Sequence, residues 1–321
     1  MVSYAAPSAP AAVQSAAAAV VARQGGVATA RQLVSWGWST SAISRKTSSG
    51  QWQRLHRGVV LLHSGPQSWR ELAHAALLYV GPGAALSHSS AAFVHGLLPR
   101  PGPLVEVSVA HERWIRPTAG VVIHRPRRMP FAVGRLRSVG EDATVVDLLH
   151  RARGTDAAVQ VVAGAVLKGL LPDRILTEAA SRTQLRHRRL LAELLGPGSD
   201  AIESPLEFRY GRDVERAHRL PRGATQVRQV VAGRWIRADR VYTGKGVRVE
   251  LDGQLAHPFG ATDDDVWRDN SVVLAHDEIT LRYRWTHVAV SPCTTAVQVA
   301  TALRRRGWPG NPRPCSDGCA V

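Results

Sequence analysis

The chain has 321 residues and a mass of 34.7 kDa, with 45% hydrophobic and 21% charged residues. This length predicts two or three domains, and this composition excludes a fibrous or wholly disordered chain. No apolar run of about 18 residues is free of Gly, Pro and charge, and the Ala-rich start lacks the basic segment of a signal peptide, so we expect a cytoplasmic protein that does not span a membrane.

The formal net charge is +16, and most of it lies in the front of the chain. Residues 1–200 contain 23 Lys and Arg against 11 Asp and Glu, whereas residues 201–321 contain 18 against 14. A positive field of this kind attracts polyanions. The arginine-rich composition of a GC-rich genome explains the same excess, so the charge alone leaves nucleic-acid binding open.

The front of the chain predicts three short helices and a hairpin. Residues 11–24, 29–36 and 39–50 each have a helical composition and end at or just before a glycine, and Thr or Ser residues can cap the second and third helices. Residues 52–62 alternate apolar and polar positions around a turn at Arg57-Gly58. This order of elements is typical of a winged helix-turn-helix.

The third helix and the hairpin carry the residues that we expect to contact double-stranded DNA. Short hydroxyl side chains on a helix read base edges in the major groove, and cations there and on a wing bind phosphates. The alternative is a small helical domain with an ordinary solvated face. The expected DNA-binding residues are Thr40, Ser41, Ser44, Arg45 and Lys46 on the helix, and Arg54 and Arg57 on the hairpin.

Residues 18–62 resemble the N-terminal domain of the AbiEi-type antitoxins. The matching motifs are GGV-T at the start, S-x-x-x-I-x-R in the third helix and G-x-W-x-R-L-x-R-G-V in the hairpin. These antitoxins are transcriptional repressors of phage-defence toxin–antitoxin operons, so the resemblance implies a DNA-binding regulator with a possible toxin partner. Val60 stands where the family often has an aromatic residue.

The middle of the chain predicts an α+β domain. Its histidines, His88, His95 and His124, are widely spaced and are interpreted as ordinary core or surface residues rather than metal ligands. The arginines of residues 125–137 fit either a nucleic-acid surface or a solvated charge run. The expected elements are helices at 69–80 and 87–98, strands at 104–109 and 120–124, and several amphipathic helices within 142–195.

The remaining domain boundaries follow from composition. A Gly-Pro-Gly-Ser sequence begins at Gly196 and predicts a linker. Cys293, Cys315 and Cys319 are the only cysteines, and because a zinc site needs a fourth ligand, we expect free thiols. The expected division is a winged helix at 1–65, an α+β middle domain at 66–195, an endonuclease-like domain at 200–308 and a flexible tail at 309–321.

Two strands after the linker bring acidic residues together. A hairpin centred on Gly244-Lys245 places Asp239 opposite Glu250, and Arg237 opposite Asp252. Directly opposed residues lie about 5 Å apart at Cβ, where two carboxylates repel by roughly 3 kcal/mol at an effective dielectric of 20. A divalent cation relieves that repulsion because Mg²⁺ takes oxygen ligands. The alternative is a solvated strand face on which neighbouring arginines neutralise the acids.

Residues 201–305 resemble the endonuclease-like domains related to very-short-patch-repair (Vsr) enzymes, within the PD-(D/E)xK superfamily. The matching segments are IESPLE, RADRVY, VRVELDG, DDDVWRDN and ITLRYRW. The resemblance implies a mixed sheet flanked by helices, with Asp239, Glu250 and Glu207 as ligands of Mg²⁺ or Mn²⁺. It also implies catalytic roles for these three residues and for Asp252 and His257. Asp252 stands where the superfamily has a lysine, so the usual charge stabiliser is missing.

The leading hypothesis is an α+β multidomain protein in which a winged helix brings a metal-dependent endonuclease domain to DNA for phosphodiester hydrolysis, in phage defence or repair. The alternative is an AbiEi-like repressor or antitoxin whose nuclease-like domain is inactive. An RNA-directed nuclease is a third possibility that no residue separates from the first.

Overall fold

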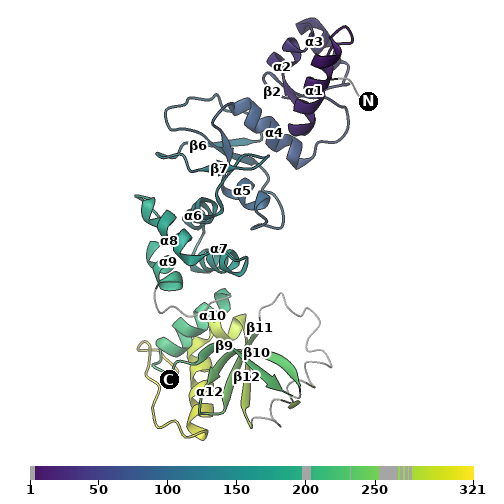
Figure 1. Cartoon of the computed structure of the whole chain (residues 1–321). Coiled ribbons are helices and arrows are strands. Elements are labelled where there is room, and N and C mark those ends of the chain that lie inside the picture. Colours follow the sequence, from purple (N-terminus) through teal and green to yellow (C-terminus); the bar gives the residue numbers. More distant parts are fainter. Residues whose placement is uncertain are drawn as a thin grey trace. The chain divides into compact units, whose positions relative to one another are not determined.

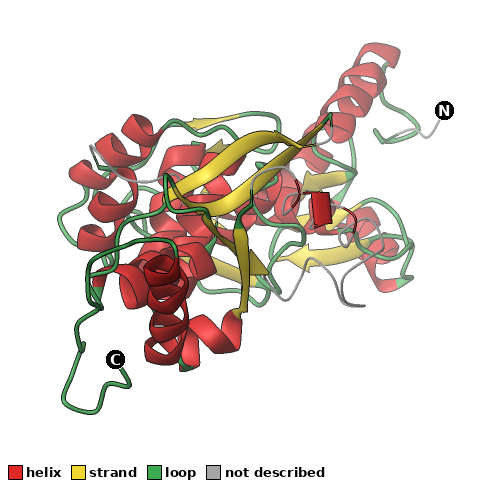
Figure 2. Ribbon diagram, turned by 90° about the horizontal axis from the view of Figure 1, so that it is seen from below, coloured by secondary structure: helices red, strands yellow, loops and turns green. Residues whose placement is uncertain are grey.

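The computed structural model describes residues 4–196, 204–231, 233–252 and 277–321, together with Trp267, Asn270, Ser271 and Leu274. Both helices and strands occur throughout this part of the chain, and the described strands form three sheets (Figures 1 and 2). The fold is therefore mixed α+β. Within the described residues, no helix is both long and apolar enough to cross a membrane.

The chain divides into two compact units that differ from the expected domains. The first contains Met1–Ala152 and Lys168–Arg186, and the second contains Arg153–Leu167 and His187–Val321. The expected boundary at residue 65 is crossed by a shared core, because Val27 and Leu61 pack in one apolar cluster with Ala75. Composition marks linkers but does not report which helices share a core.

The first unit begins with the three helices and hairpin that the sequence predicts. Thr29 and Gln32 form a reciprocal capping box at the start of the second helix, and the Ser39 hydroxyl accepts from Ala42 N at the start of the third. Gly58, with φ of 74°, forms the hairpin turn. The elements are α1 (Ala11–Arg23), β1 (Val27–Thr29), α2 (Ala30–Ser35), α3 (Thr40–Ser48), β2 (Gln53–His56) and β3 (Val59–Leu61), with sheet order β1-β3-β2.

The rest of the first unit is a five-stranded sheet with four helices. The sheet order is β6-β5-β4-β8-β7. The helix expected at 87–98 ends earlier, where Gly96 adopts φ of 69°. The elements are α4 (Trp69–Val80), β4 (Ala85–Leu86), α5 (His88–Val94), β5 (Val105–Ser108), β6 (Val121–His124), β7 (Ala132–Val133), β8 (Ser138–Val139), α6 (Glu141–Arg151) and α8 (Pro172–Ser181).

The second unit is built around a mixed four-stranded sheet of order β12-β11-β10-β9. β11 and β12 are parallel, and the other neighbours are antiparallel. Apolar residues of β11 pack in one core cluster with residues of η1 and α12. The elements are α7 (Thr155–Leu167), α9 (Arg188–Leu195), α10 (Pro205–Arg209), η1 (Tyr210–Arg216), β9 (Ala224–Val231), β10 (Arg234–Tyr242), β11 (Val247–Asp252), β12 (Ile279–Arg284), η2 (Thr286–Val290) and α12 (Pro292–Arg305).

The β10–β11 hairpin has the register that the sequence predicts. Val241 pairs with Arg248 and Tyr242 with Val247, which centres the turn on Gly244-Lys245. The expected core side of the hairpin is buried at Ala238, Val247, Val249 and Leu251, whereas Ile236 is only half-buried.

A buried arginine on the core side of β10 was not expected. Arg240 is 2% exposed, and its Nη1 lies 3.8 Å from Oε2 of Glu215. Glu215 also accepts hydrogen bonds from the Tyr242 hydroxyl at 2.9 Å and from Gly223 N at 3.0 Å. This network places a compensated ion pair inside the second unit.

The C-terminal tail (residues 309–321) lies against the second unit, in contrast to the flexible tail expected from its Pro/Gly content. Arg313 N donates to the carbonyl oxygen of His218 at 2.9 Å. Trp308, just before the tail, and Val321 at its end both pack against the core cluster of the sheet.

Candidate functional sites

Six of the seven residues expected to bind DNA are exposed on the third helix and the hairpin. Ile43 is the buried residue of α3, so the helix turns its polar residues away from the core. We call the exposed set the α3–hairpin surface; it consists of Thr40, Ser41, Ser44, Arg45, Arg54 and Arg57.

Lys46 is placed differently from the other six. Its Nζ donates to Oε1 of Gln51 at 3.0 Å and lies 5.4 Å and 5.2 Å from the ring centroids of Trp38 and Trp52. Cation–π contacts at these distances stabilise a fold by about 0.5–1 kcal/mol. Lys46 therefore joins α3 to the start of the hairpin. From the sequence we expected Lys46 to contact a DNA phosphate, and that role stays a prediction.

Glu207 lies in the first turn of α10, next to the capping residue Ser204, and is buried. The Ser204 hydroxyl accepts from Glu207 N at 3.2 Å and donates to Glu207 Oε1 at 3.1 Å, which fixes the side chain at the start of α10. Only 6% of the residue is exposed. A buried carboxylate needs donors, and the second donor comes from β9.

Gln226 joins Glu207 to Asp239. Its Nε2 donates to Glu207 Oε2 at 2.9 Å and to Asp239 Oδ1 at 3.4 Å. Its Oε1 is buried and, within the described part of the chain, has no hydrogen-bond partner, and its backbone has φ of 52°. The β9–β10 pairing skips Asp239, so Gln226 lies at an irregularity of the ladder. Two carboxylates distant in sequence thus approach one amide.

Glu250 lies on the other strand of the hairpin, as the register predicts. Asp239 Oδ2 accepts from Leu251 N at 2.7 Å, which ties its carboxylate to β11. Arg248 Nη1 lies 3.7 Å from Glu250 Oε1, but the same guanidinium pairs more closely with Glu278, at 2.9 Å. We call Glu207, Asp239 and Glu250 the carboxylate cluster.

The carboxylate cluster has the donor chemistry of a hard cation, but its oxygens are not closely gathered. Two groups of three or more ligand side chains have their ligand atoms within 4.8 Å of one another among the described residues, and neither includes the cluster. The Gln226 amide places its nitrogen against Glu207 and Asp239 and leaves its buried oxygen unsatisfied; turned over, it would present that oxygen as a further ligand. The residues present therefore fit Mg²⁺ or Mn²⁺ in ligand type.

The side chains of two expected catalytic residues, Asp252 and His257, are not among those that the structure describes. His257 lies outside the described residues, and the description of Asp252 covers only its backbone, at the end of β11 paired with Arg284. Their catalytic roles remain predictions.

The first of the two ligand groups gathers His88 and His124, which the sequence favoured as ordinary core or surface residues, with Glu106. His88 and His124 stack with ring centroids 3.7 Å apart, and His124 Nε2 lies 2.7 Å from Oε2 of buried Glu106. His95 is elsewhere, with Nε2 2.7 Å from the carbonyl oxygen of Val139. Arg151 and the Ser89 hydroxyl also contact the Glu106 carboxylate.

Two carboxyl groups in this part of the first unit, those of Glu106 and Asp147, have shifted pKa values. Burial acts to raise the pKa of Glu106, but hydrogen bonds from His124 and Ser89 and nearby positive charge lower it to about 2. Burial raises the pKa of Asp147 to about 6, although Arg182, 3.1 Å away, opposes the shift. Burial and the neighbouring His124 lower the pKa of His88 to about 3. His88, His124 and Asp147 line a pocket of about 260 Å³, and Asp147 there is paired with Arg182.

The second ligand group was missed because its members are far apart in sequence. His218, Cys293, Cys315 and Cys319 have ligand atoms within 4.8 Å of one another. The C-x₃-C spacing in the tail was the available signal, and the fourth ligand, His218, lies two residues after the end of η1.

Comparisons with known proteins cover the front of the chain best. Residues 15–63 match a family model described as a transcriptional regulator, AbiEi antitoxin, which spans the three helices and the hairpin but does not reach the carboxylate cluster. No curated protein matches the chain. Among solved structures, the RV2827C protein from Mycobacterium tuberculosis is similar at 17% identity with a TM-score of 0.39, over 62% of this chain and 82% of that chain.

Proposed function

We propose that the chain is a DNA-binding transcriptional regulator of the AbiEi antitoxin kind, and that α1–α3 with the β2–β3 hairpin act as a winged helix. The observation that carries the proposal is the α3–hairpin surface, which lies within the matched residues 15–63. In such a domain the recognition helix enters the major groove and the wing follows the backbone.

The chemistry of that surface fits duplex DNA. Ser41 and Ser44 are short enough to let α3 approach base edges, and their hydroxyls both donate and accept. Arg45 on the helix and Arg57 at the hairpin turn are exposed, so each can bind a phosphate without breaking an interior contact. Phosphate contacts supply most of the affinity, and they make binding steeply dependent on salt.

Binding to a duplex that carries the promoter of the protein's own gene tests the proposal. We expect binding to weaken as salt rises, and Arg45→Ala combined with Arg57→Ala to lower affinity by about 2 kcal/mol, roughly 30-fold, and to reduce the salt slope by about two. Fluorescence anisotropy across a salt series measures both quantities.

Arg100→Ala is the matched control, because Arg100 is an exposed arginine of the same unit outside the proposed surface. An equal loss in the control would show that overall charge, and not this surface, binds DNA. Unchanged binding by the double variant would refute the proposal. An antitoxin role adds a toxin partner, and we propose this on the family description alone.

A metal-dependent endonuclease is the second candidate, and the Gln226 arrangement favours it. The Gln226 amide nitrogen lies between Glu207 and Asp239, and its oxygen is unsatisfied. A divalent cation in the place of that nitrogen would find oxygen ligands from a helix and a strand, and from a second strand if the amide turned over. Such an ion, when bound, activates water for attack on a phosphodiester. Glu207 and Asp239 would hold it, and Glu250 would complete the set.

Two measurements separate this candidate from the regulator. Cleavage of plasmid DNA in the presence of Mg²⁺ or Mn²⁺, lost in Asp239→Asn, is the outcome expected for a nuclease. A rise in melting temperature on adding Mn²⁺, absent in Asp239→Asn, reports the ion independently of activity because a ligand that binds only the folded state raises stability. Absence of both removes the second candidate and leaves the regulator untouched.

A further inference from the structure

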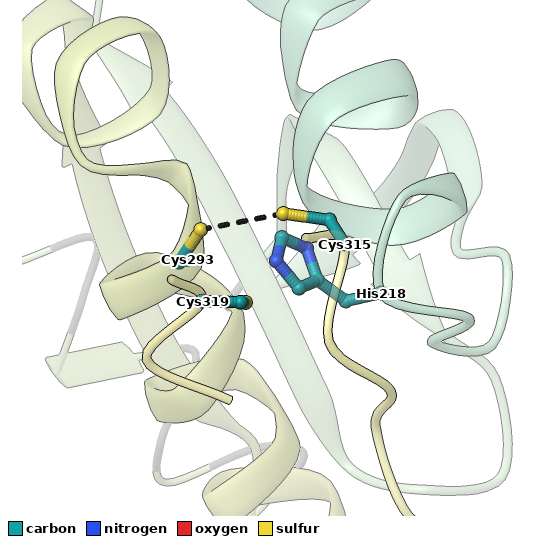
Figure 3. Close-up of side chains that lie close together, drawn as sticks. All are labelled: His218, Cys293, Cys315 and Cys319. Carbon is teal, nitrogen blue, oxygen red and sulfur yellow. Dashed lines mark hydrogen bonds between the residues drawn. The ribbon is translucent and has the colours of Figure 1, made fainter. Parts of the chain in front are cut away.

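The second unit contains four metal-ligating side chains that meet at one point. Cys293 is the second residue of α12, His218 follows η1, and Cys315 and Cys319 come from the C-terminal tail. Figure 3 shows these side chains directed toward one another. One ligand atom from each lies within 4.8 Å of those of the other three.

The sulfur spacing is that of a metal centre and not of a disulfide. Sγ of Cys293 lies 3.6 Å from Sγ of Cys315, whereas bonded sulfurs are about 2.05 Å apart. A tetrahedral ion with metal–sulfur bonds of about 2.3 Å separates its sulfur ligands by about 3.8 Å. The described cysteines are free thiols, and an ion can enter the site with little movement of these two sulfurs.

His218 provides an independent sign of a ligand. The residue is fully buried, and its Nδ1 lies 3.1 Å from the carbonyl oxygen of Val214. That contact favours the tautomer with the proton on Nδ1, so Nε2 presents a lone pair. Nε2 is buried, and among the described residues it has no hydrogen-bond partner. Metal-bound histidines are oriented in this way by a backbone carbonyl on the other nitrogen.

The backbone around the cysteines also suits thiolates. Val321 N donates to Sγ of Cys319 at 3.5 Å. Cys293 lies in the first turn of a 14-residue helix, where the helix dipole favours negative charge. Both features direct positive partial charge toward a sulfur ligand.

From this geometry we infer that His218, Cys293, Cys315 and Cys319 form a structural zinc site that clamps the C-terminal tail onto the second unit. Four protein ligands of the Cys₃His type leave no open position for substrate, which is the pattern of structural and not catalytic zinc. The ion would join the tail to α12 and to the end of η1. Arg313 N, which donates to the His218 carbonyl, and Val321, which packs on the core, are the contacts that the clamp would reinforce.

Metal analysis of the full-length protein, purified under reducing conditions, tests the inference. We expect about one zinc ion per chain, and cobalt added to the stripped protein should give the visible absorption of tetrahedral cobalt thiolate. Cys319→Ser and His218→Gln should each lose the zinc and the cobalt spectrum. A chelator should lower the melting temperature of the wild type, and added zinc should restore it.

His111→Gln is the matched control, because His111 is an exposed histidine of the first unit and is remote in sequence from the four ligands; it should retain its zinc. The cobalt titration uses the wild-type chain, so it remains informative if a ligand variant fails to fold. A reduced wild-type protein without stoichiometric metal and without a cobalt thiolate spectrum would overturn the inference. So would stoichiometric iron, or a Cys293–Cys315 disulfide in a chain that still binds no zinc after reduction.

Discussion

The α3–hairpin surface and the carboxylate cluster both concentrate charge. The charges of the first face solvent, whereas those of the second are hydrogen-bonded within the fold. Arg45 and Arg57 are exposed on a small domain whose core is apolar. Glu207 and Asp239 are instead tied to Ser204, Gln226 and the backbone of β11. Charges that face solvent are available to a polyanion, whereas charges already hydrogen-bonded within the fold require rearrangement before they bind anything else.

This difference explains why DNA binding is the better-supported function. An exposed arginine gains phosphate contacts at little structural cost. A buried carboxylate that gives up the hydrogen bond from an amide needs the bound cation to compensate its negative charge. The two regions can therefore be tested separately, by changes that affect one and leave the other intact.

The largest expected effect is on the buried pair of the second unit. Glu215→Ala removes the carboxylate beside Arg240 and leaves this cation, which is 2% exposed, without that compensating charge. The loss should lower the free energy of unfolding by about 3 kcal/mol. Urea denaturation followed by circular dichroism measures it. Glu193→Ala is the control, since the Glu193–Arg216 pair is exposed and should contribute less than about 1 kcal/mol. Equal losses of unfolding free energy in the two variants would contradict the buried pairing of Glu215 with Arg240.

A smaller effect, dependent on pH, is expected in the first unit. Glu106→Gln should destabilise the chain by about 2 kcal/mol at neutral pH, because it removes the charge that His124 and Arg151 surround. The pKa of Glu106 is lowered from 4.5 to about 2, so this stabilisation is fully present above pH 4.5 and is lost as pH falls toward 2. Melting temperatures of wild type and variant should converge in acid. A constant difference at every pH would indicate a packing effect and not a charge effect.

Arg45→Ala and Lys46→Ala sharpen the comparison within one helix. Arg45 is exposed, whereas Lys46 contacts Gln51 and two tryptophan rings. Arg45→Ala should lower affinity for promoter DNA by about 1.4 kcal/mol, or tenfold, while Lys46→Ala should have a smaller effect on affinity and lower the melting temperature instead. If Lys46→Ala weakens binding more at unchanged melting temperature, the assignment of its role is wrong.

The smallest expected effect is that of Asp239→Asn on DNA affinity. Because Asp239 lies in the other unit and is hydrogen-bonded within the fold, affinity should stay within about twofold of the wild type. Anisotropy titrations of the same promoter duplex measure it. A large loss would mean that the carboxylate cluster, directly or through its fold, takes part in binding.

Local signals in the sequence predicted the front of the chain well. Thr29, Ser39 and Gly58 act over four residues or fewer, as two caps and a turn, and α1–α3 and the hairpin lie where those signals place them. The register of the β10–β11 hairpin was likewise predicted, because its turn at Gly244-Lys245 fixes every pair that follows.

Longer-range relations were not predicted. The expected boundary at residue 65 is crossed by a core that includes Ala75. Lys46 contacts the rings of Trp38 and Trp52, which lie before and after it in the sequence. The expected flexible tail docks on the second unit. Each outcome depends on which surfaces meet after folding, and composition carries no information about that.

The sequence by itself determined most of the elements, the charge distribution and the register of the β10–β11 hairpin, since these depend on neighbours along the chain or across one turn. Only the tertiary structure decided that Gln226 lies between Glu207 and Asp239, and that His218 meets three cysteines from two other segments. Contacts between residues tens of positions apart are fixed by the packing of whole helices and strands, and no local pattern of residue types specifies them.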